Sequence, residues 1–237
     1  QTSRTGAAAQ SASPGTFVVH EVMGRHSGWL TAATALAYEP VVDALDFPEG
    51  FLMNLDLKDI DAIYVPEMHI DLEAETERLR RKMEKTGSAT IFVSEGAAVH
   101  EIVAEREAAG HELARDAFGH VRLDNIHVGD WFGKQFAKGL GAERTLVQKS
   151  GYFARSAPAN SRDLRLIKGM TDLAVHAALD GDPGLIGHDE GHGGRLRSIE
   201  FERIAGGKGF NPDEPWFRKL LQRTGQNAAD PGDPAVE

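Results

Sequence analysis

Short apolar runs alternate with longer segments of helical spacing along most of the chain. The apolar runs lie at Phe17–Val22, Ala62–Pro66, Ala89–Val93 and Thr145–Gln148. Such short runs, bounded by polar or glycine-containing turns, are typical of β-strands. Because each run is followed by a loop and then by a helical pattern, the sequence predicts an α/β fold with a mostly parallel sheet.

The clearest helical segment runs from Asp71 to Thr86. Asp71 is a favourable N-cap residue, and Gly87 is suited to end the helix in a left-handed conformation. The apolar face of this segment repeats at helical spacing, through Leu72, Thr76, Leu79 and Met83. Further helices are predicted over Trp29–Tyr38, Val99–Ala109 and Ser161–Leu179.

The pattern changes from Leu185 onward. Leu185–Gly187 and Leu196–Ile204, with a glycine-rich turn between them, predict a β-hairpin. We therefore expect four regions: a flexible segment at 1–16, an α/β region at 17–160, a helix and hairpin at 161–225, and a mobile tail at 226–237.

Composition limits the classes of function. The 237 residues are 41% apolar and 26% charged, with a net charge of −10, whereas a nucleic-acid-binding protein needs a surplus of Lys and Arg. No apolar run reaches the roughly 20 residues that span a bilayer, and no signal-peptide pattern is present. The absence of cysteine excludes disulfides and thiolate chemistry. We expect a cytoplasmic protein without a nucleic-acid or membrane partner.

Three loops that follow predicted strands carry candidate chemistry. Met23-Gly24-Arg25 follows the first strand, Glu95-Gly96 the third, and Tyr152–Arg155 lies in the loop after the fourth. In open parallel sheets, ligands bind beyond the carboxyl ends of the strands. Two arginines can bind a phosphate while a carboxylate accepts hydrogen bonds from sugar hydroxyls, so these loops predict a site for a phosphorylated substrate. Taken singly, each is explained as a solvated cation or a helix start.

Three other patterns have simpler explanations. His20-Glu21 begins like the zinc-protease motif, but Gly24 stands where the second histidine belongs. The metal-ligand types in His188–His192 lie in a glycine-rich stretch, which a hairpin turn explains. The basic run Arg78–Lys82 lies among glutamates, as expected of a solvated helix face.

Four segments, in order along the chain, resemble phosphofructokinases, and most closely the pyrophosphate-dependent bacterial group. They are Val19–Ala35, Ile91–Gly96, Arg115–His120 and Gln148–Asn160. The resemblance runs from about Phe17 to about Phe217. It implies the Rossmann-like, three-layer α/β phosphofructokinase fold with its N-terminal part missing, and a region 161–225 that packs back on the missing N-terminal domain.

The resemblance also implies roles for the loop residues. Arg25 is the implied catalytic residue, because it would place a cation beside the reacting sugar oxygen of fructose 6-phosphate. Glu95 would accept hydrogen bonds from the sugar hydroxyls, and Tyr152 and Arg155 would bind the 6-phosphate. No metal ligand is implied in this chain. The implied substrate-binding residues are Met23, Gly24, Arg25, Glu95, Tyr152 and Arg155.

The complete enzyme that the resemblance implies would transfer a phosphoryl group from diphosphate to O1 of fructose 6-phosphate, reversibly and in glycolysis, with Mg²⁺. The glycine-rich donor loop of the family and its Thr-x-Asp segment, which carries the general base, do not occur in this chain. We therefore expect the C-terminal portion of such an enzyme, inactive alone, with the main Mg²⁺ ligands elsewhere.

Assembly and the phosphoryl donor follow from the resemblance in the same way. The family forms homo-dimers or homo-tetramers that share sites between subunits, and Thr16, Arg25 and His26 are expected near the shared region. Lys149 and Arg144 are further candidate phosphate ligands. The sequence of Ser156–Asn160 favours the pyrophosphate-dependent enzymes of the family over the ATP-dependent ones. A fragment of an ATP-dependent enzyme and a non-catalytic, sugar-phosphate-binding regulatory subunit are the alternatives.

Overall fold

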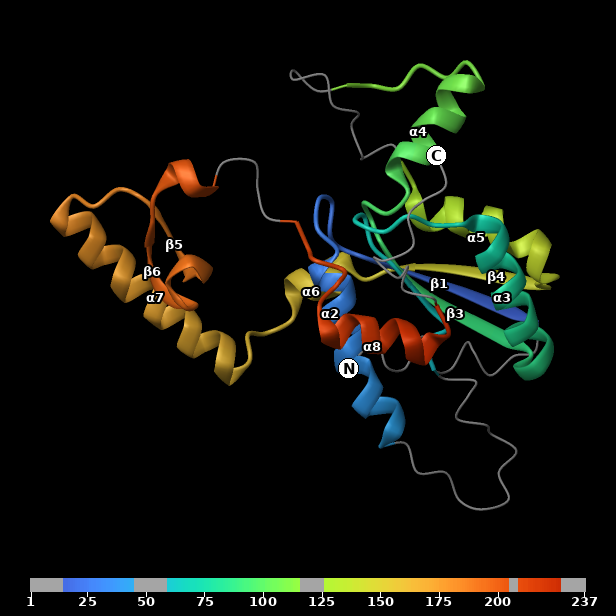
Figure 1. Cartoon of the computed structure of the whole chain (residues 1–237), viewed down its shortest axis with the longest axis horizontal. Coiled ribbons are helices and arrows are strands. Elements are labelled where there is room, and N and C mark those ends of the chain that lie inside the picture. Colours follow the sequence, from blue (N-terminus) through green and yellow to red (C-terminus); the bar gives the residue numbers. More distant parts are fainter. Residues whose placement is uncertain (1–14, 45–58, 116–125, 205–208, 227–237) are drawn as a thin grey trace. The chain divides into compact units, whose positions relative to one another are not determined.

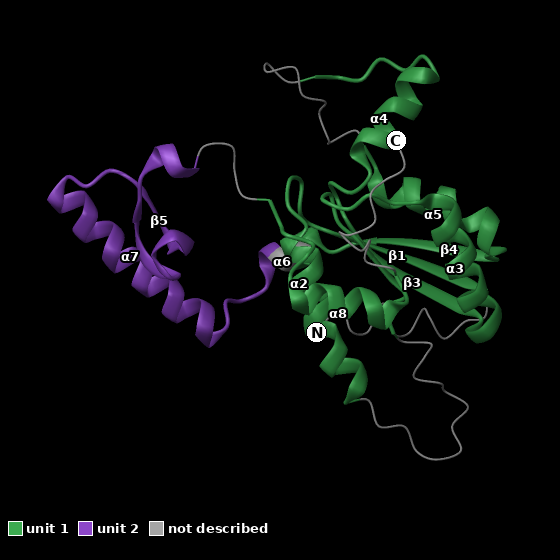
Figure 2. Ribbon diagram, in the orientation of Figure 1, with its two compact units in different colours: residues 1–154, 209–237 green, residues 155–208 purple. Residues whose placement is uncertain are grey.

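The computed structural model describes residues 15–44, 59–115, 126–204 and 209–226, without the side chains of Tyr152 and Ala154. Residues 116–120 of the third resembling segment, Arg115–His120, lie outside the described residues, as do the outer parts of both predicted flexible ends, 1–14 and 227–237. The chain divides into two compact units, residues 1–154 with 209–237, and residues 155–208 (Figure 2).

A four-stranded parallel sheet forms the centre of the first unit (Figure 1). Its strands are β1 (Thr16–Val22), β2 (Ala62–Tyr64), β3 (Ser88–Ser94) and β4 (Arg144–Lys149), in the order β2-β3-β1-β4. All neighbouring pairs are parallel, which confirms the predicted sheet. The register pairs Val22 with Ser94, so β1 and β3 end side by side.

Helices cover both faces of this sheet, because successive strand side chains point to opposite sides. Phe17 and Val19 belong to a core shared with α3 (Leu72–Thr86), α4 (Val99–Ala108) and α5 (Val128–Leu140). Ile63 and Phe92 belong to a second core shared with α2 (Trp29–Asp43) and α8 (Pro215–Thr224). This arrangement confirms the predicted three-layer α/β fold.

The helix predicted from local signals alone has the predicted bounds. In α3, the Asp71 carboxylate accepts hydrogen bonds from the amides of Glu73 (3.1 Å) and Ala74 (3.0 Å), and Gly87 ends the helix at φ 80°. α2 continues past its predicted end at Tyr38 and includes Pro40. The last turn of α2 buries Val42, which supports the extension.

One expectation for α3 is wrong at two residues. Arg80 and Arg81 pair with Glu77 on the exposed surface, as predicted. The guanidinium of Arg78 instead donates to the backbone oxygens of Asp61 (2.8 Å) and Thr224 (2.7 Å), and Lys82 pairs with the buried Asp61. Arg78 and Lys82 therefore face structure, not solvent.

Two helices of the first unit are absent from the sequence prediction. α5 buries Phe132, Phe136 and Leu140, and Phe132 stacks on Tyr64 at a centroid distance of 5.1 Å. α8 starts with Pro215 and buries three apolar side chains against α2 and β2: Phe217, Leu220 and Leu221. Residues 209–226 therefore belong to the first unit, whereas the packing of 161–225 on an N-terminal domain stays a prediction.

The second unit consists of one long helix and a hairpin. α7 (Ser161–Asp180) starts at an Asn160 capping box, and β5 (Leu185–Asp189) pairs antiparallel with β6 (Arg195–Ile199), which confirms the predicted hairpin. Its second strand ends before the predicted Ile204, because Phe201–Ile204 form a 3-10 helix. Residues 149–160, predicted as a loop, include the short helix α6 (Gly151–Ser156). Asp189 is buried and binds Arg203 through two 2.6 Å hydrogen bonds, which hold the pKa of its carboxyl well below its usual value.

The boundaries of the ordered region also differ from the prediction. Thr16, placed in the flexible N-terminal segment, is buried in β1, and Gln226, placed in the mobile tail, is buried against β2. None of the described helices is both long and apolar enough to cross a membrane.

Candidate functional site

Two loops meet where β1 and β3 end. The amide of Glu95 donates to the carbonyl of Val22 at 2.9 Å, and the Ser94 hydroxyl donates to the carbonyl of Gly24 at 2.6 Å. These bonds join the loop 23–28 to the turn 95–98, so the structure brings together the segments that carry Arg25 and Glu95. Arg25 is exposed and Glu95 is half-buried, so both reach the surface at this edge of the sheet.

Two glycines permit this close approach. Gly24 has φ +146°, a conformation that residues with a side chain rarely adopt, and a Cβ there would lie 2.5 Å from the carbonyl oxygen of Ser27. A Cβ on Gly96 would lie 2.1 Å from the carbonyl oxygen of Arg25. The backbones of the two loops are therefore in contact, and larger residues at either position would separate them.

The turn after β3 is strained where α4 begins. Ala98 has φ 53°, the only positive φ of a non-glycine residue in the described part of the chain. Such a conformation is unfavourable for alanine and persists only where the surrounding structure imposes it. The amide of Ala97 donates to the carbonyl of Ser94 at 2.9 Å, which closes the turn directly below Glu95.

The far end of the loop 23–28 is held by a carboxylate. Both oxygens of Glu67, which follows β2, accept from the amide of Gly28, at 3.2 and 3.1 Å. Glu67 also accepts from the amide of Phe210 at 2.8 Å. A negative charge at the N-terminus of α2 is favourable because the first amides of a helix have no partner within it. Glu67 thus anchors the start of α2 and the segment that leads to α8.

A second carboxylate, Glu21 of β1, is buried beside the loop. One of its oxygens accepts from the amide of Gly129 at 2.8 Å, and the other lies 3.3 Å from Nζ of Lys149. Glu21 is a charged residue within an otherwise apolar predicted strand. Because a buried carboxylate needs partners, this position was the sequence signal for a buried, paired side chain. In the sequence, Glu21 also forms part of the incomplete zinc motif.

The remaining predicted residues are placed differently. A Cβ on Gly151 would lie 3.2 Å from Cγ of Met23, so the start of α6 approaches the Met23 side chain. The side chain of Tyr152 lies outside the description, and Arg155 belongs to the second unit, so their proximity to Arg25 stays a prediction. Lys149 ends β4 at the carboxyl edge.

Two other predicted residues lie at the amino ends of their strands. Arg144 pairs in register with Thr16 at the amino ends of β4 and β1. Because the loops lie at the carboxyl ends, Arg144 is not a ligand at this edge. Thr16 is buried at the opposite end of β1 from the loop of Arg25, and the expectation that it lies near a region shared between subunits stays a prediction.

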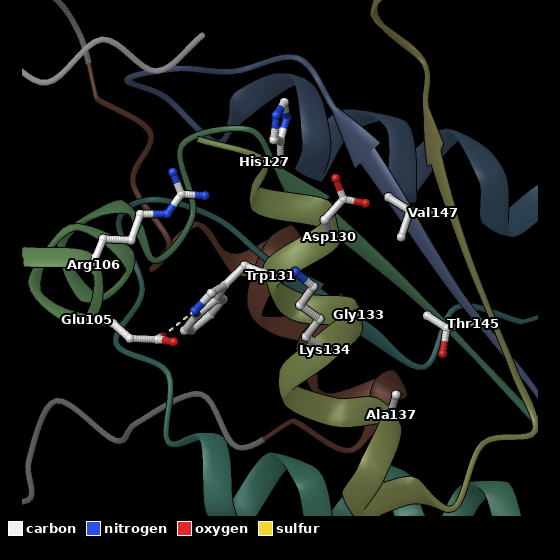
Figure 3. A pocket seen from close by; sticks show the side chains of 10 residues that line it. All are labelled: Glu105, Arg106, His127, Asp130, Trp131, Gly133, Lys134, Ala137, Thr145 and Val147. Atoms are coloured by element: carbon white, nitrogen blue, oxygen red, sulfur yellow. Dashed lines mark hydrogen bonds between the residues drawn. The ribbon is translucent and has the colours of Figure 1, made fainter. Parts of the chain in front are cut away.

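A cavity of about 480 Å³ lies elsewhere, between α4, α5 and β4 (Figure 3). Its wall includes a hydrogen bond of 2.6 Å from the Trp131 indole to Glu105, and its floor includes Val147. None of the predicted substrate residues whose side chains the structure describes lines this cavity. Among the described residues, no group of three or more His, Asp or Glu side chains gathers as a metal site.

Comparison with known proteins identifies relatives. The family model for phosphofructokinase matches residues 2–178. A pyrophosphate--fructose 6-phosphate 1-phosphotransferase of Mastigamoeba balamuthi is 56% identical over 219 residues, which cover 92% of this chain and 53% of that protein. The enzyme of the same name from Methylomonas methanica is 53% identical, covering 92% of this chain and 54% of that protein.

A solved structure has the same fold. It is a pyrophosphate-dependent phosphofructokinase from Nitrosospira multiformis, with a TM-score of 0.56 at 20% identity, matched over 99% of this chain and 55% of that one. The chain thus spans about half the length of the relatives it matches.

Proposed function

This chain belongs to the phosphofructokinase family, and from that premise we propose that it supplies the fructose 6-phosphate half of the active site of a pyrophosphate-dependent enzyme. The observation that carries the proposal is the contact between the loops of Arg25 and Glu95, through Ser94 and Gly96. The names of the relatives above support diphosphate as the phosphoryl donor.

In the proposed reaction, O1 of fructose 6-phosphate forms a bond to one phosphorus of diphosphate, and the bridging P–O bond breaks to release phosphate. Negative charge spreads over the transferred group in the transition state, so a nearby guanidinium lowers the barrier by charge stabilisation. We assign this role to Arg25. Glu95 orients the sugar by accepting hydrogen bonds from its hydroxyls, and Met23 and Gly24 shape the same surface.

The 6-phosphate is assigned to Tyr152 and Arg155. A guanidinium can bind two phosphate oxygens at once, and a tyrosine hydroxyl can donate to a third. Arg155 is exposed, so its guanidinium is accessible to a ligand.

Mg²⁺ is the proposed cofactor of the whole enzyme, in which it would neutralise charge on the diphosphate oxygens. The described residues of this chain do not form a carboxylate cluster suited to it, so no step is assigned to it here. We propose that the Mg²⁺ ligands and the general base lie in the part of the protein that corresponds to the half of the relatives that this chain does not match. The chain alone is accordingly proposed to be inactive, and the whole enzyme to be a cytoplasmic homo-dimer or homo-tetramer.

The test measures binding and turnover separately. We would assay the 237-residue chain, and the protein encoded by the complete reading frame that contains it, with fructose 6-phosphate and either diphosphate or ATP. Diphosphate-dependent turnover by the complete product supports the proposal. Turnover with ATP alone would indicate the ATP-dependent alternative, binding without turnover would indicate a regulatory subunit, and turnover by the 237-residue chain would refute its incompleteness.

Arg155 provides a test of the phosphate subsite. Arg155→Ala should weaken fructose 6-phosphate binding by about 1.5–3 kcal/mol, because a hydrogen bond to a charged group is lost. Arg162→Ala, at an exposed arginine on α7, is the matched control and should leave the affinity unchanged. An unchanged affinity of the Arg155 variant would remove Arg155 from the site.

A further inference from the structure

Ser94 lies at the junction of the two loops of the candidate site. It is the last residue of β3 and is fully buried, so its hydroxyl does not reach solvent or a bound sugar. That hydroxyl donates to the carbonyl of Gly24 at 2.6 Å. Ser94 directly precedes Glu95, and Gly24 directly precedes Arg25. The hydrogen bond therefore joins the two loops immediately beside both proposed substrate-binding residues.

The bond holds a peptide that is otherwise easy to rotate. Gly24 has φ +146°, and glycine has more accessible backbone conformations than any other residue. Rotation of the peptide between Gly24 and Arg25 would redirect the Arg25 side chain. A hydrogen bond from a buried hydroxyl fixes that peptide because the hydroxyl, once buried, has a strong preference for a protein partner.

We propose that Ser94 is a positioning residue for the fructose 6-phosphate subsite. Its hydroxyl holds the carbonyl of Gly24 so that Arg25 and Glu95 approach one sugar from adjacent loops. This inference rests on the proposed function, since it assigns a role within that same site. It predicts that loss of the hydroxyl affects the sugar phosphate and leaves diphosphate binding, assigned to another part of the protein, unaffected.

Loss of a buried serine hydroxyl can also lower the stability of the fold without any specific effect on a site. Ser88 provides a control for this general effect. Ser88 begins β3, is buried like Ser94, and lies at the amino end of the strand, far from both loops. Removing its hydroxyl changes a buried serine of the same strand without touching the loop 23–28.

The test compares four variants of the protein encoded by the complete reading frame. Ser94→Ala removes the hydroxyl, Ser94→Cys replaces it with a weak donor of similar size, Ser94→Thr retains it, and Ser88→Ala is the control. Titration calorimetry measures the affinities for fructose 6-phosphate and for diphosphate. Hydrogen exchange measures protection of the Glu95 amide, which is bonded to Val22 beside the loop.

We expect Ser94→Ala and Ser94→Cys to bind fructose 6-phosphate about tenfold more weakly, with diphosphate affinity within about twofold of the unmodified protein. Both should exchange the Glu95 amide faster, whereas Ser94→Thr and Ser88→Ala should resemble the unmodified protein. An unchanged fructose 6-phosphate affinity, or an equal loss for both ligands, overturns the proposal. If the unmodified protein does not bind fructose 6-phosphate, the proposed function fails, and the exchange rates alone decide whether Ser94 holds the loop.

Discussion

Gly96 occupies the point at which the two loops of the candidate site touch. A methyl group there would lie 2.1 Å from the carbonyl oxygen of Arg25, and the opposing atom is backbone that cannot rotate away. Gly96→Ala should therefore destabilise the fold by about 1–3 kcal/mol and displace Arg25, with a loss of fructose 6-phosphate binding. Denaturant unfolding and calorimetry measure the two effects.

Gly169→Ala is the control for that substitution. Gly169 lies in α7, where an added Cβ would make an ordinary contact with Leu196 at 3.5 Å. Alanine is favoured over glycine within helices, so this variant should be as stable as the unmodified chain or more so. If Gly96→Ala bound fructose 6-phosphate as tightly as Gly169→Ala does, the contact between the two loops would not be needed for the proposed site.

Asp61 makes stability depend on pH. Burial raises the pKa of its carboxyl from 3.8 to about 6, although Lys82 and the amide of Thr90 act in the opposite direction. Because the pKa in the folded state exceeds that in the unfolded state, the stabilisation is fully present below pH 3.8 and is lost as the pH rises through about 6.

The effect is visible as a difference between two proteins. From pH 4 to pH 7, the unmodified chain should lose about 2 kcal/mol of unfolding free energy relative to Asp61→Asn, whose amide does not titrate. Urea unfolding across this range measures the difference and cancels the contributions of other carboxylates. A constant difference between the two proteins would show that Asp61 titrates normally.

At the scale of elements, the edge strand β2 is completed by a side chain. The Gln226 amide accepts from the backbone amide of Ile63 at 2.8 Å and donates to the carbonyl of Ile63 at 3.2 Å, in the manner of a neighbouring strand. Gln226→Ala leaves both buried groups without this partner and should destabilise the chain by about 1–3 kcal/mol. Gln222→Ala, on the exposed side of α8, should have little effect in the same thermal unfolding experiment.

The elements differ in how far the sequence predicts them. α3 is predicted with its bounds because its cap, apolar stripe and terminal glycine are all local. α5 is not, because glycines in its first turns lower helix propensity. A Cβ on Gly129 would lie 2.8 Å from Val147, so that glycine permits close packing on β4, a long-range cause that a local pattern does not reveal.

The candidate site divides in the same way. Arg25 and Glu95 follow predicted strands, so strand order is enough to place them at one edge. Ser94 and Glu67 act through bonds to residues 70 and 39 positions away, and such pairs depend on strand order and register. The family resemblance implies the roles of Arg25 and Glu95, whereas the side chains that hold the loop 23–28 are identified only by the fold.

At the scale of the whole molecule, the second unit contains a helix with two apolar faces. Met170, Leu173 and Ala177 of α7 are half-buried on the side of the hairpin, whereas Leu164 and Ile167 are exposed by 58% and 53%. A helix that is apolar on both sides is normally enclosed by other structure. The match covers about half of the length of the relatives. We propose that residues 161–204 pack against the part of the protein that corresponds to the other half.

That proposal predicts opposite effects of one change in two proteins. Leu164→Lys with Ile167→Lys should reduce self-association of the 237-residue chain in sedimentation velocity, because it removes exposed apolar surface. In the product of the complete reading frame, the same change buries two charges and should lower the melting temperature by about 5 °C or more. Arg165→Lys with His176→Lys, at exposed polar positions of α7, should change neither measurement. If the complete product tolerated the two lysines at positions 164 and 167 without loss of stability, this face of α7 would be solvent-exposed in the whole enzyme, and the second unit would not be a docking element for the donor half.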